Sequence, residues 1–321
     1  LGFFLYLLYN YFDINLEDKM KIVVAIGGNA LGNNVENQKQ NVKITAKSIA
    51  NLVELGHQIV LVHGNGPQVG MINNAFEGNG MPFPECGAMS QGYIGFHLQN
   101  AIKNEFLYRG IQKEVTTILT QIKVDKNDPA FSNPTKPIGS FLSLDEAQEM
   151  KNKNGYHFVE DSGRGFRRVI ASPKPVDVIE KKIIKELFES DKLIIAAGGG
   201  GIPVILKDNE LKGVDAVIDK DYAAAKIAEL VETDLLLILT AVNCVKLHFG
   251  TKEETNIKSL NLSEIEKYTQ ENHFKVGSMK PKVEACRTFI KNNKTKLAII
   301  ASLHEADSAV KKKSGTIIKY L

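Results

Sequence analysis

The chain has 321 residues, enough for one large domain or for two lobes of ordinary size. Hydrophobic residues make up 43% and charged residues 24% of it, as in an ordinary globular protein. The formal net charge is only +3, and lysines and arginines form no long run, so the composition excludes a protein that binds nucleic acid through its overall charge.

Cysteine and histidine usage argues against a disulfide framework and against a metal site. Cys86, Cys244 and Cys286 lie far apart and form no CxxC pair, and no HExxH spacing occurs. Scattered cysteines of this kind are typical of a reducing compartment. We therefore expect a cytoplasmic protein in which no metal is held by protein ligands alone.

Residues 1–19 begin with an apolar segment of about twelve residues, short of the ~20 needed to cross a bilayer. The segment lacks the basic start and the small-residue cleavage site of a signal peptide, and Met20 stands directly before a strong strand. We expect residues 1–19 to be a non-native or disordered extension, with no membrane partner. A segment that binds an interface or a partner protein is the alternative.

From Lys21 onward, short runs rich in Val, Ile and Leu alternate with segments of helical spacing. Runs of this kind suit strands that are buried on both faces, as in a parallel sheet covered by helices. The alternation therefore predicts an open α/β sheet with right-handed crossovers. The runs are KIVVAI (21–26), HQIVLVH (57–63), VTTILTQI (115–122), KLIIAA (192–197), DLLLILT (234–240) and KLAIIAS (296–302).

The helical segments are marked by apolar residues that recur every three or four positions, at 42–53 and again at 178–188. Gly56 stands where the C-terminal cap of the first segment belongs. Ser263 and Glu266 have the spacing of a capping box before a further short helix.

Residues 125–175 break this rhythm with five prolines and several glycines. A structureless loop of this length is improbable inside a compact domain. We interpret it as a small subdomain that projects from the first lobe.

Three strands run directly into glycine-rich turns. In open α/β sheets, ligands bind beyond the carboxyl ends of strands, and glycine lets backbone N–H groups approach a phosphate. For one isolated loop, a turn that needs glycine only for its geometry is a better explanation than a ligand site. Three such loops at one edge of a sheet favour an anion-binding site instead. Four glycines in a row are entropically costly, so a purely structural role explains 198–201 poorly. The turns are Gly27-Gly28-Asn29-Ala30, His63-Gly64-Asn65-Gly66-Pro67 and Gly198-Gly199-Gly200-Gly201.

Familiar nucleotide signatures do not match these loops. No GxxxxGK[ST] motif occurs, which excludes a P-loop enzyme. Residues 64–70 come close to a dinucleotide fingerprint, but one residue too many precedes the last glycine. A dehydrogenase hypothesis also leaves the other two loops without a use.

Two lysines stand at the positive ends of predicted helices. Lys220 lies beside Asp221, which we expect to cap the following helix, and Lys282 follows Pro281 in the first turn of another. A cation there opposes the helix dipole by roughly 0.3–1 kcal/mol. Solvated surface lysines are the alternative, but bound anions would explain both positions, as phosphoryl transfer requires.

Several motifs together resemble the carbamate kinases of the amino-acid kinase family, in order and over nearly everything from Met20 onward. The resemblance implies a three-layer α/β/α sandwich around a mainly parallel open sheet, with a small protruding subdomain, and a homodimer. The motifs are GGNAL (27–31), HGNGPQVG (63–70), the segment from Asp125 through NPTKPIG (133–139), GGGGIPV (198–204), AVIDKD (216–221) and GSMKPKVEA (277–285).

The resemblance also implies which residues bind each substrate and which act on the phosphoryl group. Residues 20–180, including the subdomain at about 125–175, would bind carbamate or carbamoyl phosphate, and residues 181–321 would bind ATP or ADP with its Mg²⁺. Lys136, Lys220 and Lys282 would surround the transferring phosphoryl group, with Asp221 orienting the last two. Substrate would contact Gly27, Gly28, Asn29, Gly64, Asn65, Gly66, Gly199 and Gly200, and the nucleotide would contact Lys220, Phe249, Met279 and Lys282.

The chain departs from the family pattern at three places. Ala25 stands where many relatives outside the carbamate kinases have a lysine, which favours the carbamate branch. Phe249 replaces an expected tyrosine, so stacking on adenine is kept while a phenolic contact is lost. Phe166 replaces a usual tryptophan.

No nucleophile beside a base is evident, so we expect direct in-line transfer without a phosphoenzyme. Because carbamoyl phosphate is a reactive mixed anhydride, we expect the enzyme to make ATP from it, as in arginine fermentation. The rivals are a kinase of the same fold with another acceptor, and a silent regulator that binds nucleotide or carbamoyl phosphate.

Overall fold

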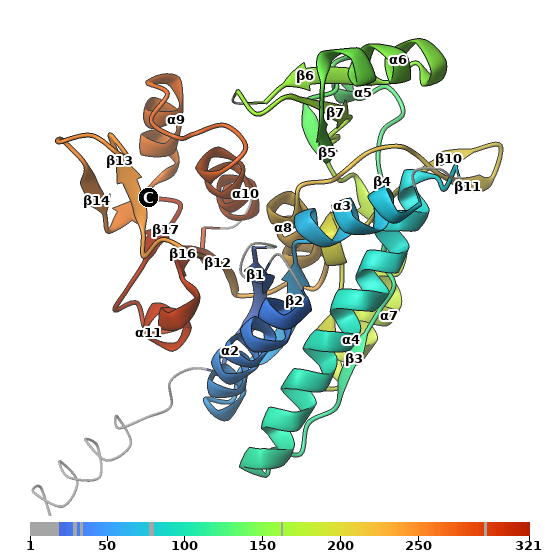
Figure 1. Cartoon of the computed structure of the whole chain (residues 1–321). Coiled ribbons are helices and arrows are strands. Elements are labelled where there is room, and N and C mark those ends of the chain that lie inside the picture. Colours follow the sequence, from blue (N-terminus) through green and yellow to red (C-terminus); the bar gives the residue numbers. More distant parts are fainter. Residues whose placement is uncertain (1–18, 28–30, 33–34, 77–79, 162, 292–293) are drawn as a thin grey trace, which may run out of the picture.

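A computed structural model describes residues 19–27, 31–32, 35–76, 80–161, 163–291 and 294–321 (Figure 1). Its centre is an eight-stranded sheet with the order β15-β17-β16-β12-β1-β2-β9-β3. The strands from β16 to β3 run parallel, and β17 is antiparallel to β16. The strand bounds are β1 Lys21–Ile26, β2 Gln58–His63, β3 Val115–Thr117, β9 Leu193–Ile195, β12 Leu235–Thr240, β15 Ser259–Leu260, β16 Leu297–Ser302 and β17 Thr316–Ile318.

Helices cover both faces of this sheet, as the alternation of runs predicts. Along β1, Ile22 and Val24 pack into a core formed with α2 (Val35–Glu54), α4 (Phe83–Arg109) and α11 (Ala306–Val310). Val23 and Ala25 point the other way, into a core with α7 (Lys181–Glu189), α8 (Lys220–Leu230), α9 (Leu262–Gln270) and α10 (Met279–Lys291). The three-layer α/β/α arrangement is therefore confirmed. No helix among the described residues is long and apolar enough to span a bilayer.

The run at 115–122 is two strands rather than one, so this prediction was wrong. β3 pairs with β9 in the main sheet, whereas β4 (Gln121–Lys123) belongs to a second sheet of order β11-β10-β4-β8. The chain turns at Thr120, whose backbone N–H donates to Gln91 Oε1 at 2.8 Å and whose hydroxyl donates to the Ile118 carbonyl at 2.8 Å. The other strands of this sheet are β8 Asp177–Val178, β10 Ile202–Lys207 and β11 Glu210–Gly213.

Two details of the helix predictions also need correction. Val178 lies in β8, and α7 buries Ile184 and Phe188 while Ile183 is 44% exposed, so the periodic stretch was placed too early. The capping box of α9 consists of Asn261 and Glu264 rather than Ser263 and Glu266. Both pairs have the same three-residue spacing, and the helix begins at the earlier one.

A small sheet projects from the main body, at the top of Figure 1. Its order is β5-β7-β6, formed by β5 (Lys136–Leu142), β6 (His157–Glu160) and β7 (Phe166–Ile170), with α5 (Pro129–Ser132) and α6 (Leu144–Asn154) beside it. Ile138 and Ile170 at its base pack against Val69 of α3 (Gly66–Ala75). Below, "the subdomain" means residues 129–170. On the left of Figure 1, β13 (Val245–Leu247) and β14 (Thr255–Ile257) form a hairpin.

Candidate active site

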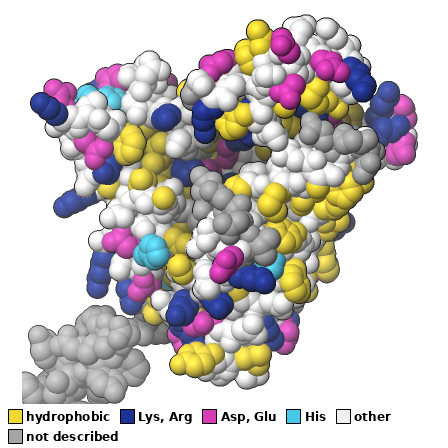
Figure 2. All heavy atoms as spheres, viewed as in Figure 1, with side chains coloured by type: hydrophobic (Ala, Val, Ile, Leu, Met, Phe, Trp, Pro, Cys, Tyr) yellow, Lys and Arg dark blue, Asp and Glu magenta, His cyan; other side chains and the backbone are white. Residues whose placement is uncertain are grey.

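A cleft of about 1050 Å³ opens at the carboxyl edge of the main sheet. Gly27 follows β1 there, Gly64 follows β2, and Thr240 and Ser302 end β12 and β16. The subdomain and α10 stand on either side of it, and Figure 2 shows the molecule hollowed between them. The fold therefore brings the predicted loops to one place, where ligands of open α/β sheets bind.

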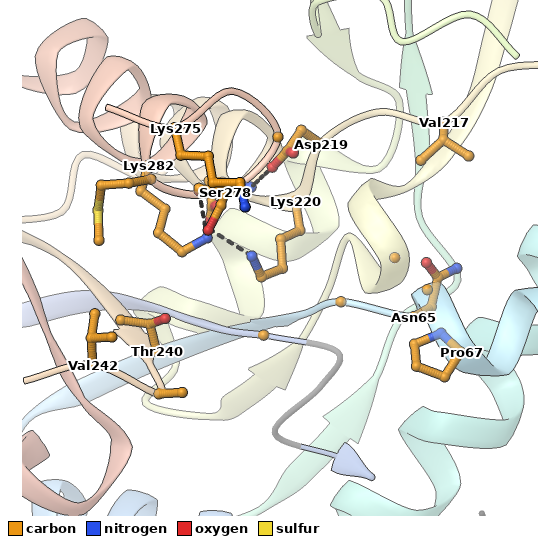
Figure 3. A pocket seen from close by; sticks show the side chains of 18 of the residues that line it. Asn65, Pro67, Val217, Asp219, Lys220, Thr240, Val242, Lys275, Ser278 and Lys282 are labelled. Atoms are coloured by element: carbon orange, nitrogen blue, oxygen red, sulfur yellow. Dashed lines mark hydrogen bonds and ion pairs between the residues drawn. The ribbon is translucent and has the colours of Figure 1, made fainter. Parts of the chain in front are cut away.

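Lys220, Asp221 and Lys282 meet on one wall of this cleft. Lys220 Nζ lies 2.9 Å from Asp221 Oδ1, and Lys282 Nζ lies 3.0 Å from Asp221 Oδ2. The Asp221 side chain is 1% exposed, and both lysines are largely buried. Figure 3 shows Lys220 and Lys282 reaching from α8 and α10 toward each other beside Ser278, whose carbonyl also accepts from Lys282 Nζ at 3.2 Å.

The cap of α8 is Asp219 and not Asp221, contrary to the sequence prediction. Asp219 Oδ1 accepts a hydrogen bond from the Asp221 backbone N–H at 3.0 Å. Asp221 is thereby free to turn its side chain to the two lysines. Asp219 was missed as a site residue, although an aspartate directly before the first helical residue is itself a strong capping signal.

Lys136 reaches the cleft from the first residue of β5. Its Nζ lies 3.2 Å from Asp219 Oδ2, so the side chains of Lys136, Asp219, Lys220, Asp221 and Lys282 form a series of alternating charges. We call these five side chains the charge series. With three cations and two anions it carries a net positive charge toward any bound phosphate.

Burial and neighbouring charges shift the pKa values of Lys220 and Asp219 in opposite directions. Burial alone lowers the pKa of Lys220, but Asp221 and Asp219 outweigh it and raise that pKa above its usual value. Burial likewise raises the pKa of Asp219, but Lys136 and Lys220 outweigh it and hold the pKa below its usual range. The cleft therefore presents fixed charges at neutral pH.

Gly27 and Gly66, in the first two glycine loops, leave open space at the cleft. A methyl group placed at either would meet no atom of the described residues within 4 Å. Gly64 and Asn65 also line the cleft, and Asn65 Nδ2 donates to Ser90 Oγ of α4 at 2.8 Å. Pro67 lies in the first turn of α3, as predicted. Gly28 and Asn29 lie outside the described residues.

The third loop, Gly198–Gly201, is built differently. A methyl group at Gly199 would lie 2.1 Å from Asn65 Nδ2, and one at Gly200 would lie 1.9 Å from the Ile218 carbonyl oxygen. Gly199, Gly200 and Gly201 also have positive φ angles of 67°, 94° and 86°. Close packing thus explains the four glycines, contrary to the sequence argument that structure explains them poorly. Gly199 lines the cleft, whereas Gly200 is buried and is absent from its lining.

His63 ends β2 beneath these loops and was not predicted as a site residue. Its Nδ1 lies 2.9 Å from the Gly64 carbonyl oxygen, and its Nε2 would meet a methyl group placed at Gly198 at 2.5 Å. Complete burial lowers its pKa to about 4, so the ring is neutral at physiological pH. It therefore supports the loops by its shape and adds no charge.

The far end of the cleft lies toward the β13–β14 hairpin. Phe249, 63% exposed, and Met279 line it together with Val242 and His273. Cys244 lines it too, and burial raises the pKa of its thiol, so that thiol stays protonated at neutral pH. In the part of the chain that the structure describes, His, Cys, Asp and Glu form no group of three or more that could hold a metal ion.

Comparisons with known proteins agree with this geometry. The sequence profile of the Amino acid kinase family matches residues 20–301. The chain is 52% identical over 312 residues to a carbamate kinase of Clostridium perfringens, covering 93% of this chain and 99% of that one. It is 50% identical over 306 residues to the carbamate kinase-like protein YqeA of Escherichia coli, covering 93% and 98%. The solved carbamate kinase of Giardia lamblia bound to AMP-PNP superposes with a TM-score of 0.89 at 39% identity, over 95% of this chain and 99% of that one.

The fold and the cleft are therefore those of a kinase, a phosphotransferase. The chain belongs to the amino acid kinase family, among its carbamate kinases.

Proposed function

We propose that this protein transfers a phosphoryl group reversibly between ATP and carbamate, and that it works toward ATP synthesis from carbamoyl phosphate and ADP. The observation that carries the proposal is the pair of buried lysines, Lys220 and Lys282, held on one aspartate at the edge of a cleft that has open space at Gly27 and Gly66. Burying two ammonium groups is expensive unless anions accompany them. Asp221 supplies one negative charge for the two lysines, so the pair keeps a positive charge that a substrate phosphate can neutralise.

The lysines of the charge series act on the transferring group. Lys136, Lys220 and Lys282 neutralise charge on its oxygens, and Asp221 orients Lys220 and Lys282. Preorganised charge of this kind lowers the barrier without covalent help from the protein. Backbone N–H groups at Gly27, Gly66 and Gly199, and in the loop of Gly28 and Asn29, would hold carbamate and phosphoryl oxygens. The Gly64 N–H instead donates to the Ile26 carbonyl oxygen at 2.9 Å, so Gly64 would contact substrate only through the space it leaves in the cleft.

Transfer is direct and in line, with no phosphoenzyme. The thiol nearest the far end, Cys244, stays protonated because burial raises its pKa, and His63 is buried beneath the loops. Neither is an activated nucleophile. Release of the phosphoryl group from a mixed anhydride drives the reaction toward ATP, which suits a fermentative pathway that degrades arginine.

The nucleotide would occupy the far end of the cleft, with adenine stacked on Phe249, Met279 beside it and the phosphates at Lys220 and Lys282. We propose that Mg²⁺ arrives bound to those phosphates and neutralises part of their charge. Asp219 and Asp221 are already engaged by lysines, and the described residues offer no ready-made group of protein ligands for the ion.

We also propose a cytoplasmic homodimer in which residues 20–180 bind carbamoyl phosphate and residues 181–321 bind nucleotide. Exposed apolar side chains on α4 and near the edge strand β3, among them Phe96, Leu107 and Leu119, support a dimer contact there. Figure 2 shows hydrophobic side chains along the flank where Figure 1 places α3 and α4. Residues 1–18 lie outside the described part of the chain and have no role in the proposed function.

The test is ATP formation by the purified protein from carbamoyl phosphate and Mg·ADP, followed by a coupled assay. Lys220→Ala and Lys282→Ala should each lower kcat by at least ~10²-fold, the effect of losing one preorganised charge donor. Lys226→Ala is the matched control, because Lys226 lies on the same helix α8 but pairs with Glu229 away from the cleft. It should retain normal turnover.

Near-normal turnover in both cleft variants would reject the assigned roles. A wild-type protein that binds ADP but makes no ATP from carbamoyl phosphate would reject carbamate as the acceptor. Turnover with an acylated amino acid or a nucleoside monophosphate would then indicate another kinase of this fold, and binding without any turnover would indicate a regulator.

A further inference from the structure

Asp219 is the member of the charge series to which the family resemblance gave no role. Its side chain is 14% exposed and lies where the subdomain meets the N-terminus of α8. It bridges two parts of the cleft that are far apart in the sequence, since Lys136 belongs to β5 and Asp219 directly precedes α8.

The two oxygens of this carboxylate make separate contacts. Oδ1 accepts the backbone N–H of Asp221 and caps α8, whereas Oδ2 lies 3.2 Å from Lys136 Nζ. A cap needs only a short polar side chain, and Asn or Ser caps about as well as Asp. The contact of Oδ2 with Lys136 is different, because it depends on the negative charge.

Lys136 needs such a partner because little else fixes its ammonium group. Its side chain is 34% exposed, and its carboxylate contact within the described chain is with Asp219. A flexible four-carbon lysine side chain loses much rotamer freedom when it is held in one position. Lys220 and Lys282, in contrast, are both fixed by the buried Asp221.

We propose that Asp219 is a positioning residue that holds Lys136 beside Lys220 at the site of phosphoryl transfer. The proposal rests on the proposed function and adds a residue to it. The charge of Asp219 keeps the Lys136 ammonium directed into the cleft, and the phosphoryl oxygens then take over part of that contact when substrate binds.

A second acidic–basic contact between the same two regions provides a matched control. Asp215 lies four residues before Asp219 in the sequence, and its Oδ2 is 2.8 Å from the guanidinium group of Arg168 in β7. Neither Asp215 nor Arg168 lines the cleft. Asp215→Asn therefore removes one negative charge and one ion pair with the subdomain without touching Lys136.

The experiment compares Asp219→Asn and Asp219→Ser, which keep the cap, with Asp215→Asn. Both Asp219 variants should lower kcat/KM for carbamoyl phosphate at least about 10-fold, change the KM for ADP less than about 3-fold, and melt within a few degrees of wild type. Asp215→Asn should retain wild-type kcat/KM. Adding Asp219→Asn to Lys136→Met should change kcat/KM less than about 2-fold beyond Lys136→Met alone, because the two residues act as one unit.

A second measurement does not depend on catalysis and uses nuclear magnetic resonance. In ligand-free protein with ¹³C-labelled lysines, the Lys136 Cε signal, assigned by its loss in Lys136→Met, should move in Asp219→Asn and stay in place in Asp215→Asn. Wild-type kinetics in both Asp219 variants, or full additivity with Lys136→Met, would overturn the proposal. If wild type itself does not use carbamoyl phosphate, the proposed function fails, and the Lys136 signal alone then decides whether Asp219 holds this lysine.

Discussion

The second and third glycine loops meet at the same cleft but use glycine for opposite reasons. Around Gly66 there is open space, since an added methyl group would meet no atom of the described residues within 4 Å. Around Gly199 and Gly200 there is none, because added methyl groups would overlap Asn65 and the backbone of Ile218. The third loop thus forms the packed floor against which the second loop is held.

This difference shows that a glycine-rich sequence does not by itself identify a phosphate cradle. Glycine is required where a ligand approaches the backbone, and equally where two chain segments approach each other. Substitution by alanine separates the two cases, because it should reduce activity in the open loop and folding in the packed loop.

The largest effect is expected from Gly200→Ala. The new methyl group would lie 1.9 Å from the Ile218 carbonyl oxygen, at a φ of 94° that alanine adopts poorly. We expect the free energy of unfolding to fall by about 3 kcal/mol or more, measured by urea denaturation. Unchanged stability would contradict the packed-floor interpretation.

The acid stability of the protein should depend on His63, which supports both loops. Its pKa is about 4 in the fold and about 6.5 in the unfolded chain, so between these values only the unfolded chain binds the proton. The free energy of unfolding should therefore fall by about 3 kcal/mol as the pH drops from 6.5 to 4. The free energy of unfolding should be measured by denaturation at a series of pH values. The loss between pH 6.5 and 4 should disappear in His63→Gln and remain in His157→Gln, since His157 is exposed.

Gly66→Ala should separate activity from stability. Because the site has room for a methyl group and an ordinary φ, we expect the melting temperature to stay close to wild type. The methyl group would occupy space that the substrate oxygens need, and kcat/KM for carbamoyl phosphate should fall about 10-fold, or about 1.4 kcal/mol. Full activity of Gly66→Ala would mean that the second loop does not contact substrate, so the two loops would not differ in the way proposed.

The smallest effect is expected from Gly87→Ala, the reference for both loops. Gly87 lies within α4, where an added methyl group would meet no side chain or distant backbone of the described residues within 4 Å and where alanine is the better helix former. The free energy of unfolding should rise by about 0.5–1 kcal/mol, with activity unchanged. A loss of stability would show that the neighbours of Gly87 leave no room for a methyl group.

Much of the fold could be predicted because long apolar runs have one stable arrangement. The run at 21–26 matches β1 residue for residue, and its alternate side chains enter the two cores. The run at 115–122 could not be divided from sequence, since the break at Thr120 is made by Gln91 of a distant helix. Local periodicity contains no information about such a partner.

The candidate site shows the same limit. Lys220 and Lys282 were found because their positions oppose the helix dipole, which is a local signal. Asp219 and His63 were missed because their roles depend on Lys136 and Gly198, which approach them only in the folded chain. The glycine run was explained by ligand binding because its packing partners, Asn65, Ile122 and Ile218, could not be seen in the sequence.

The strand order has a consequence for how the protein is made. β1 emerges from the ribosome long before β12, yet Ile22 lies opposite Leu235 of β12 in the finished sheet. At 5–20 residues per second, synthesis of the intervening chain takes roughly 10–40 s. During that time one edge of this apolar strand lacks its neighbour, and such an edge invites pairing with other chains. The nascent protein therefore passes through a long interval in which protection by chaperones matters most, well before its cleft exists.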